Sequence, residues 1–126
     1  MKLYKILIKK EDKYYSPFQD YCYGTLKEFI GKKFICKNFD DSEKECSNGF
    51  YATDLIGLIY TNLSSADKVV FEVEMSGKNI KFSEYKWRWE NQKFIRTVPI
   101  EKVKEKIKSL KLDWNYYEML FPYNPL

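Results

Sequence analysis

The 126-residue chain contains no histidine, only three cysteines and five glycines, and no apolar run long enough to cross a membrane. Without histidine, a serine or cysteine nucleophile lacks its usual side-chain base, which excludes hydrolases of that type. Cys22, Cys36 and Cys46 do not have the close spacing of zinc or redox pairs. Because the glycines do not cluster, a phosphate-binding loop is also excluded. We therefore expect no metal site, and thiols that are either buried or idle.

The residues that are present are typical of one globular domain over residues 1–126. Hydrophobic residues make up 44% of the chain and charged residues 32%, and this length accommodates a single core. The net charge of +4 is smaller than that of a dedicated nucleic-acid binder. Charged residues at positions 9–12 interrupt the first apolar segment before a signal peptide could form. We expect a cytoplasmic protein without a membrane segment.

Apolar patterning predicts an α+β fold with a mixed or antiparallel sheet. The clearest strand is 69–75, in which apolar side chains alternate with Glu72 and Glu74. A turn is expected at 76–79 and a polar loop at 11–19. The other expected strands are 3–8, 21–23, 33–37, 80–82 and 86–98.

Two helices are expected besides a brief turn over 25–30. A central short helix over 54–63 would begin at Thr53 or Asp54, both of which are good N-cap residues. A C-terminal amphipathic helix over 100–111 follows Pro99, because its apolar residues recur every three or four positions.

The last segment, 112–126, is rich in aromatic residues, whereas disordered tails are poor in them. We expect it to dock on its own domain, with contact to a partner as the alternative. Candidate partner-binding residues are Trp114, Tyr117 and Phe121 in this tail, with Lys86 and Arg88 in the preceding strand.

Glu72 and Glu74 are the candidate catalytic residues, because side chains two apart on a strand share one face. Beside a cleft, such a pair could position a ribose hydroxyl or stabilise positive charge at an anomeric carbon. Tyr23, Tyr51 and Tyr60 are candidate nucleotide-stacking residues. The alternative is that the two glutamates simply face water.

The segment 86–96 alternates basic and aromatic residues, which is the chemistry of single-stranded nucleic-acid binding. Strand alternation, however, places Trp87 and Trp89 on the face opposite Lys86 and Arg88. Core tryptophans with outward basic residues are therefore favoured over a nucleic-acid site.

The segments Gly31-Lys32-Lys33-Phe34, Cys46-Ser47-Asn48-Gly49-Phe50-Tyr51-Ala52 and 71–77 together resemble a small bacterial and phage domain with a Cys-x-x-Gly-Phe-His-Ala motif. That domain is similar in layout to the ADP-ribosyltransferase-like fold, which some phage anti-CRISPR proteins share. The resemblance implies that Tyr51 replaces the family histidine, with Tyr60 and Glu72 or Glu74 downstream. It also implies NAD as a cofactor if the chain is a transferase.

Because a phenol replaces the imidazole, binding is favoured over catalysis. The leading hypothesis is a phage or mobile-element protein that acts in the host cytoplasm without a cofactor and inhibits a host defence complex by protein contact. The lysine-, isoleucine- and asparagine-rich composition, typical of AT-rich genes, agrees with that origin. The alternatives are an NAD-dependent ADP-ribosyltransferase and, less favoured, a nucleic-acid-binding module.

Overall fold

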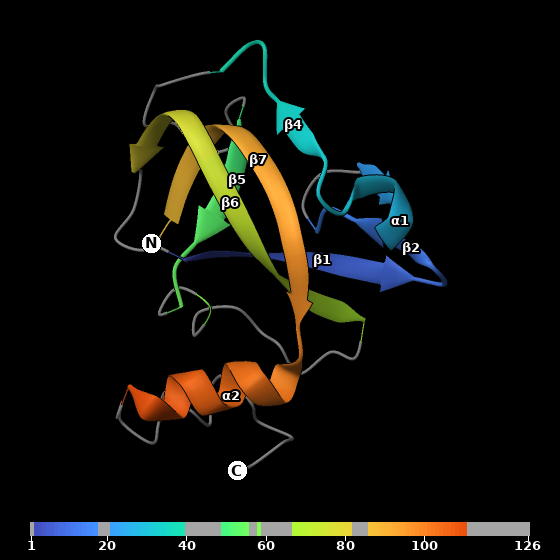
Figure 1. Ribbon diagram of the computed structural model, residues 1–126, viewed down its shortest axis with the longest axis vertical. Helices are drawn as coiled ribbons and strands as arrows, with labels where there is room; N and C mark the ends of the chain where they lie inside the picture. The colour runs from blue at the N-terminus through green and yellow to red at the C-terminus, as the bar shows by residue number, and fades with distance from the viewer. Residues whose placement is uncertain are drawn as a thin grey trace.

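The described part of the chain forms an antiparallel sheet with two helices in the computed structural model (Figure 1), which confirms the α+β prediction. The structure describes residues 2–17, 21–39, 49–55, 58, 67–81 and 86–110. In chain order, the elements are β1 (Leu3–Lys10), β2 (Lys13–Tyr15), β3 (Cys22–Gly24), α1 (Leu26–Phe29), β4 (Lys33–Ile35), β5 (Phe50–Thr53), β6 (Lys68–Lys81), β7 (Lys86–Val98) and α2 (Ile100–Ser109).

Four strands pair in a closed ring. Strand β1 pairs with β6, β6 with β7, β7 with β5, and β5 returns to β1 through the pair Tyr4 and Thr53, all antiparallel. Strands β2 and β3 extend the sheet from β1, while β4 pairs with the middle of β7. The closed arrangement leaves few free strand edges and encloses an interior between the strands.

The long β6–β7 hairpin makes this closure possible. The turn expected at 76–79 is instead a bulge within β6, since the register with β7 shifts between Ser76 and Asn79. Gly77 has a φ of 80°, and a Cβ there would lie only 2.5 Å from a Glu90 carboxylate oxygen. A bulge bends its strand and increases the twist, which lets one continuous strand curl around the interior. Figure 1 shows this curvature in β6 and β7.

Other differences from the sequence prediction are local. Residues 11–19, expected as a loop, contain β2, which folds back on β1 through Glu11 at a φ of 59°. Helix α1 is a single turn, with both the backbone N–H and the hydroxyl of Thr25 donating to the Glu28 carboxylate. The helix expected over 54–63 falls almost entirely outside the described residues, and so does the aromatic tail 112–126.

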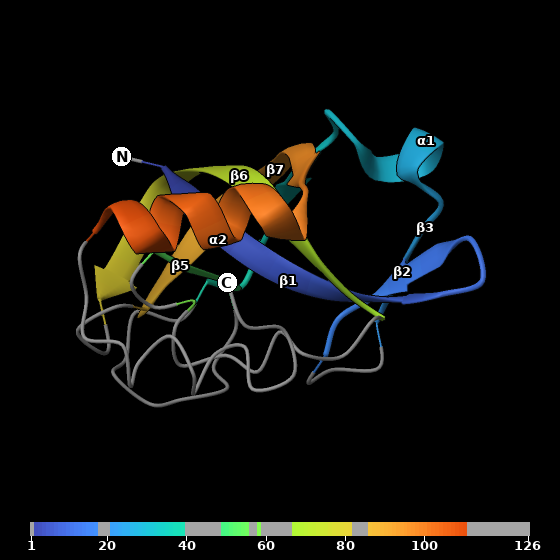
Figure 2. The ribbon, with the colours of Figure 1, turned by 90° about the horizontal axis from the view of Figure 1, so that it is seen from below.

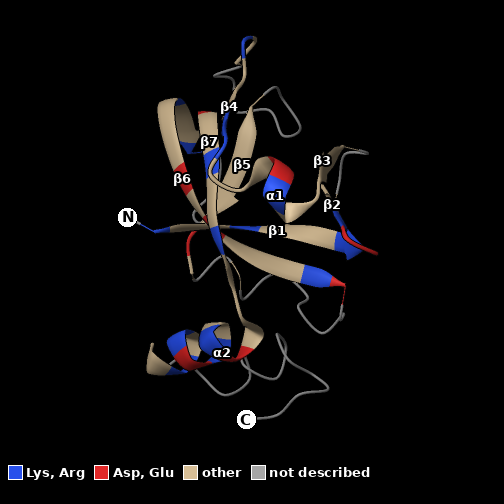
Figure 3. Ribbon diagram, turned by 45° about the vertical axis from the view of Figure 1, so that its right-hand side comes forward, with Lys and Arg blue, Asp and Glu red and all other residues tan. Residues whose placement is uncertain are grey.

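Helix α2 covers one face of the sheet and confirms the predicted C-terminal amphipathic helix. Its buried Val103 and Ile107 pack against Tyr4, Val70 and Leu58. Figure 2 shows the helix lying across the sheet, and Figure 3 shows that many positions of the helix are lysine or glutamate. Neither helix of the described part of the chain is long and apolar enough to cross a membrane.

The second core fills the interior of the ring and is mainly aromatic. Phe29 from α1 contacts Phe71 and Phe94 with ring centroids 5.7 and 5.1 Å apart, and Tyr14 packs edge-on against Phe71 at 5.4 Å. Edge-to-face pairs of this kind add to the free energy gained by burial. Because Phe29, Phe71 and Phe94 have 0–1% of their surface exposed, this cluster holds α1 and the ring together.

Truncation of this cluster should be costly. We expect Phe94→Ala to lower the free energy of unfolding by about 3–5 kcal/mol, since it removes a fully buried ring and leaves a cavity. Urea denaturation measures the change. The control is Ile35→Ala on β4, whose side chain is 61% exposed and should change stability by no more than about 0.5 kcal/mol. A loss below 1 kcal/mol for Phe94→Ala would contradict the described core.

Candidate functional site

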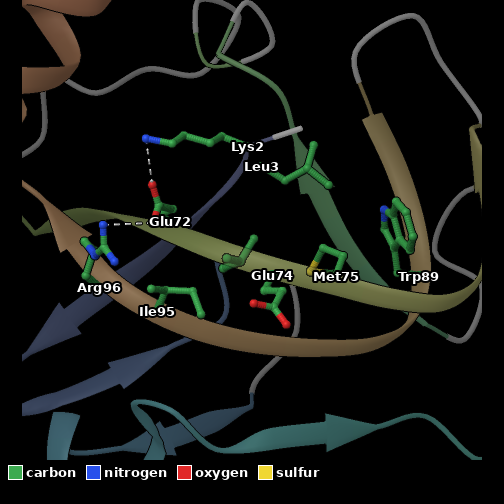
Figure 4. Close-up of a pocket in the computed structure, with 9 residues that line it drawn as sticks. Lys2, Leu3, Glu72, Glu74, Met75, Trp89, Ile95 and Arg96 are labelled. Atoms are coloured by element: carbon green, nitrogen blue, oxygen red, sulfur yellow. Dashed lines mark ion pairs between the residues drawn. The ribbon is translucent and has the colours of Figure 1, made fainter.

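A groove of about 450 Å³ runs along β6 beside the N-terminal end of β1. Its floor is apolar, and charged side chains stand at one end (Figure 4). The groove is lined by Lys2, Leu3, Glu72, Val73, Glu74, Met75, Trp89, Ile95 and Arg96.

Three charged residues converge at one end of the groove. The Glu72 carboxylate lies 3.5 Å from the Lys2 ammonium and 3.3 Å from the Arg96 guanidinium. Strand pairing sets this geometry, because Glu72 lies directly opposite Arg96 and opposite Tyr4, two residues after Lys2. The Glu72 side chain is only 13% exposed, whereas those of Lys2 and Arg96 are about two-thirds exposed. This end therefore carries one excess positive charge that is open to solvent.

Trp89 lies at the other end of the groove. It pairs with Phe50 of β5 and Asn79 of β6, so its backbone is held between two strands. Its indole Nε1 is buried and has no hydrogen-bond partner within the described part of the chain. Almost all buried donors in proteins are satisfied, so this indole N–H is an exception among the described residues.

Glu74 lies between these two ends and is exposed. It also borders a smaller hollow of about 170 Å³, together with Lys33 of β4 and Lys93 of β7. Glu72 and Glu74 therefore line the same groove. No hydrogen bond or ion pair of Glu74 is present among the described residues.

Of the predicted nucleotide-stacking tyrosines, Tyr23 and Tyr51 do not lie in this groove. Tyr23 is inside the ring, with its ring centroid 5.1 Å from that of Phe94. Tyr51 pairs with Arg88 across β5 and β7, and the guanidinium lies 5.9 Å from its ring centroid. Tyr60 is outside the described residues. In the described part of the chain, neither Tyr23 nor Tyr51 is brought together with the two glutamates.

The partner-binding prediction is corrected for one residue. Arg88, expected to face outward from its strand, is fully buried, because Gly49 has no side chain and leaves room for it. Lys86 begins β7, but its side chain is outside the description. Trp114, Tyr117 and Phe121 also lie outside the described residues. Trp87 and Trp89 pack against the interior cluster, although both remain partly exposed.

A second polar feature lies inside the ring and was not predicted. Side chains alternate between the two faces of β1, so Lys5 shares a face with the core residues Leu3 and Leu7. Its ammonium group reaches into the aromatic interior. The nitrogen donates a 2.8 Å hydrogen bond to Oε1 of the buried Gln92. Nε2 of the same amide donates a 3.0 Å bond to the Tyr23 hydroxyl.

Three ring faces surround the Lys5 nitrogen, which lies 5.6–6.0 Å from the ring centroids of Tyr23, Phe50 and Phe94. Burial away from water lowers the pKa of Lys5 from 10.5 to about 7. A signal for this residue exists in the sequence, since regular alternation through Leu3, Lys5 and Leu7 puts one lysine on the core face of the strand.

The lowered pKa of Lys5 makes stability depend on pH. Between pH 7 and 10.5, unfolded chains bind a proton that folded chains lack, so stability should rise with pH by up to about 1.4 kcal/mol per unit. Below pH 7 both states are protonated, and the full cost of burying the charge remains.

We therefore expect Lys5→Met to remove this part of the slope. Denaturant unfolding of both proteins at pH 7, 8.5 and 10 measures it, and the advantage of the variant should shrink as pH rises. Lys10→Met, at an exposed position on the same strand, should keep the wild-type slope. A constant difference between wild type and Lys5→Met across this range would argue against a neutral interior amine.

Within the described ranges, no group of three or more histidine, cysteine, aspartate or glutamate residues could hold a metal ion. Comparison with protein-family models, with curated proteins and with solved structures found no match to this chain. The features that bear on function are therefore the groove along β6 and the amine inside the ring.

Proposed function

We propose that the protein is a non-catalytic binding module that receives a segment of a partner protein in the groove along β6. The observation that carries this proposal is the composition of the groove: an exposed cationic end, an apolar floor and an indole N–H without a partner among the described residues. Interfaces combine the same elements, with a buried aromatic or apolar centre and a charged rim.

The groove suggests the chemistry of its occupant. Lys2 and Arg96 share one carboxylate, so a second acidic group from a partner would meet an excess positive charge there. An apolar side chain fits the floor between Leu3 and Met75. We therefore expect a short segment with an acidic residue beside an apolar one.

Binding is favoured over group transfer by the state of the glutamates. Two cations already bind Glu72, which limits its ability to stabilise a developing positive charge. The predicted nucleotide-stacking residues Tyr23 and Tyr51 also lie away from the two glutamates. Nucleic-acid binding through β7 is less favoured because Arg88 is buried.

The resemblance to phage-encoded inhibitors extends the proposal to the partner. In this extension, the partner is a protein of a host defence complex, and occupancy of the groove blocks that complex. No cofactor takes part. The contact is expected to depend on the cationic end of the groove.

Charge reversal at the groove tests this proposal. Tagged wild-type protein and Arg96→Glu are used in pull-downs from bacterial lysate, with bound proteins quantified by mass spectrometry. A specific partner should be lost from the variant by about tenfold or more, because a carboxylate would repel the acidic segment. Lys27→Glu on α1 carries the same charge change at an exposed position away from the groove and should retain the partner. Equal recovery by all three proteins would contradict the assignment of the groove.

The transferase alternative makes a different prediction. On the binding proposal, incubation of the protein and lysate with adenine-labelled NAD transfers no label above a control without the protein. If label is transferred, Glu74→Gln separates the alternatives, since only a catalytic Glu74 would make the transfer depend on that carboxylate. Label that appears with the wild type and disappears with Glu74→Gln would replace binding by ADP-ribosyl transfer as the function.

A further inference from the structure

The amine of Lys5 has no role in the binding proposal, yet its surroundings differ from those of a structural lysine. Structural lysines keep their charge beside a carboxylate or in water. Lys5 has no carboxylate partner, because no carboxylate oxygen of the described residues lies within 4.0 Å of it. Its hydrogen-bond acceptor is the neutral amide of Gln92 at 2.8 Å, and the rings of Tyr23, Phe50 and Phe94 lie 5.6–6.0 Å from the nitrogen.

From the aromatic cluster and the Lys5–Gln92–Tyr23 hydrogen-bond chain, we propose that Lys5 is a nucleophilic amine that condenses with small aldehydes to form an imine. The product is a covalently modified protein, and the chemical class of the substrate is a short, uncharged aldehyde. The proposal does not depend on the groove or on a protein partner.

Nucleophilic attack requires a neutral amine. Removal from water destabilises the ammonium form, whereas the three ring faces and the Gln92 oxygen stabilise it. Desolvation prevails, and the pKa of Lys5 falls to about 7. Near neutral pH, roughly half of the Lys5 side chains are then uncharged, against about one in several thousand for an ordinary lysine.

Formation of an imine also needs a proton donor, and Tyr23 fits that role. Its hydroxyl oxygen accepts from Nε2 of Gln92, so its own proton remains available. Burial raises the pKa of Tyr23, with the hydrogen bond from Gln92 acting in the opposite direction, so the phenol stays protonated near neutral pH. The Gln92 amide thus binds the Lys5 amine through its oxygen and the Tyr23 hydroxyl through its nitrogen.

The reaction balances without an oxidant or reductant. The Lys5 nitrogen forms a bond to the carbonyl carbon, the C=O π bond breaks, and one of the two amine protons moves from nitrogen to the carbonyl oxygen to give a carbinolamine. Tyr23 protonates that hydroxyl, which leaves as water while the nitrogen lone pair forms the C=N bond. The remaining N–H proton returns to the phenolate. Aldehyde and amine are thereby converted to imine and water.

The surroundings limit which compounds can reach the amine. The Lys5 side chain is partly exposed, and Phe50 and Tyr23 flank its nitrogen, so only a small compound is expected to reach the amine. Among described groups facing it, Tyr23 of β3 is titratable, while β5 and β7 contribute Phe50, Phe94 and Gln92. Arg88 projects from the same side of β7 and lies against Tyr51.

Reductive labelling tests the proposal. The folded protein is treated with propanal and cyanoborohydride at pH 6 to 9, and alkylation of each lysine is followed by peptide mass spectrometry. Lys9 and Lys10, exposed on the same strand, are internal references. At pH 7, Lys5 should react at least about tenfold faster than either, with a rate that rises to a plateau around pH 7–8. Equal rates at Lys5 and Lys9 in the folded protein would overturn the proposal.

Two variants test the chemistry separately from folding. Gln92→Glu places a carboxylate where the amide oxygen now accepts from Lys5, which should restore the charge and remove the preference for Lys5. Tyr23→Phe keeps the ring but removes the proton donor, so imine formation should slow severalfold while acetylation by acetic anhydride does not. Circular dichroism checks both folds. If Gln92→Glu does not fold, the pH profile of the wild-type protein and the rate of imine formation in Tyr23→Phe test the proposal. An unchanged rate of imine formation in Tyr23→Phe would show that the phenol takes no part in the mechanism.

Discussion

Closure of the sheet through the β6–β7 hairpin is the constraint on which the other features depend. Because β6 and β7 are long and bent, the same two strands contact β1 at one end and β5 at the other. The closure creates an inside, which the phenylalanine cluster fills, and an outside, part of which α2 covers. The groove lies along the part of this ribbon where Glu72 and Arg96 face each other.

The two functional proposals use different environments of one sheet. In the groove, charges remain near water, where an ion pair contributes little stability but can select a partner and speed its association. Inside the ring, burial lowers the pKa of the same type of side chain to about 7. Lys2 and Lys5 are three residues apart on or beside β1. In our proposals, the exposed Lys2 contributes an electrostatic contact, whereas burial makes Lys5 a nucleophile.

Local signals in the sequence predicted much of the fold. Strict alternation identified the part of β6 around Phe71, and the three- and four-residue spacing of Val103 and Ile107 identified α2. The bulge at Gly77 was read as a turn, since one glycine between polar residues has the same local signature in both cases. For the groove, alternation placed Glu72 and Glu74 on one face, but Lys2 and Trp89 come from distant segments and join it only through strand pairing. The sequence pattern placed Arg88 on the outward face of its strand, whereas the residue is buried. The curl of β7 and the space beside Gly49, which bury it, arise only when the ring closes.

The pairing of β1 has a consequence for how the chain folds. The C-terminal end of β1 pairs with the adjacent β2, whereas Leu3 is matched with Val73 of the distant β6. Until β6 has been synthesised, the edge of β1 that pairs with it is open to pairing with other chains. Proteins dominated by such distant contacts fold slowly, since a long loop must close before any stabilising contact forms. The charged Lys9 and Lys10 at the end of the strand are residues of the kind that discourage edge-to-edge association during this interval.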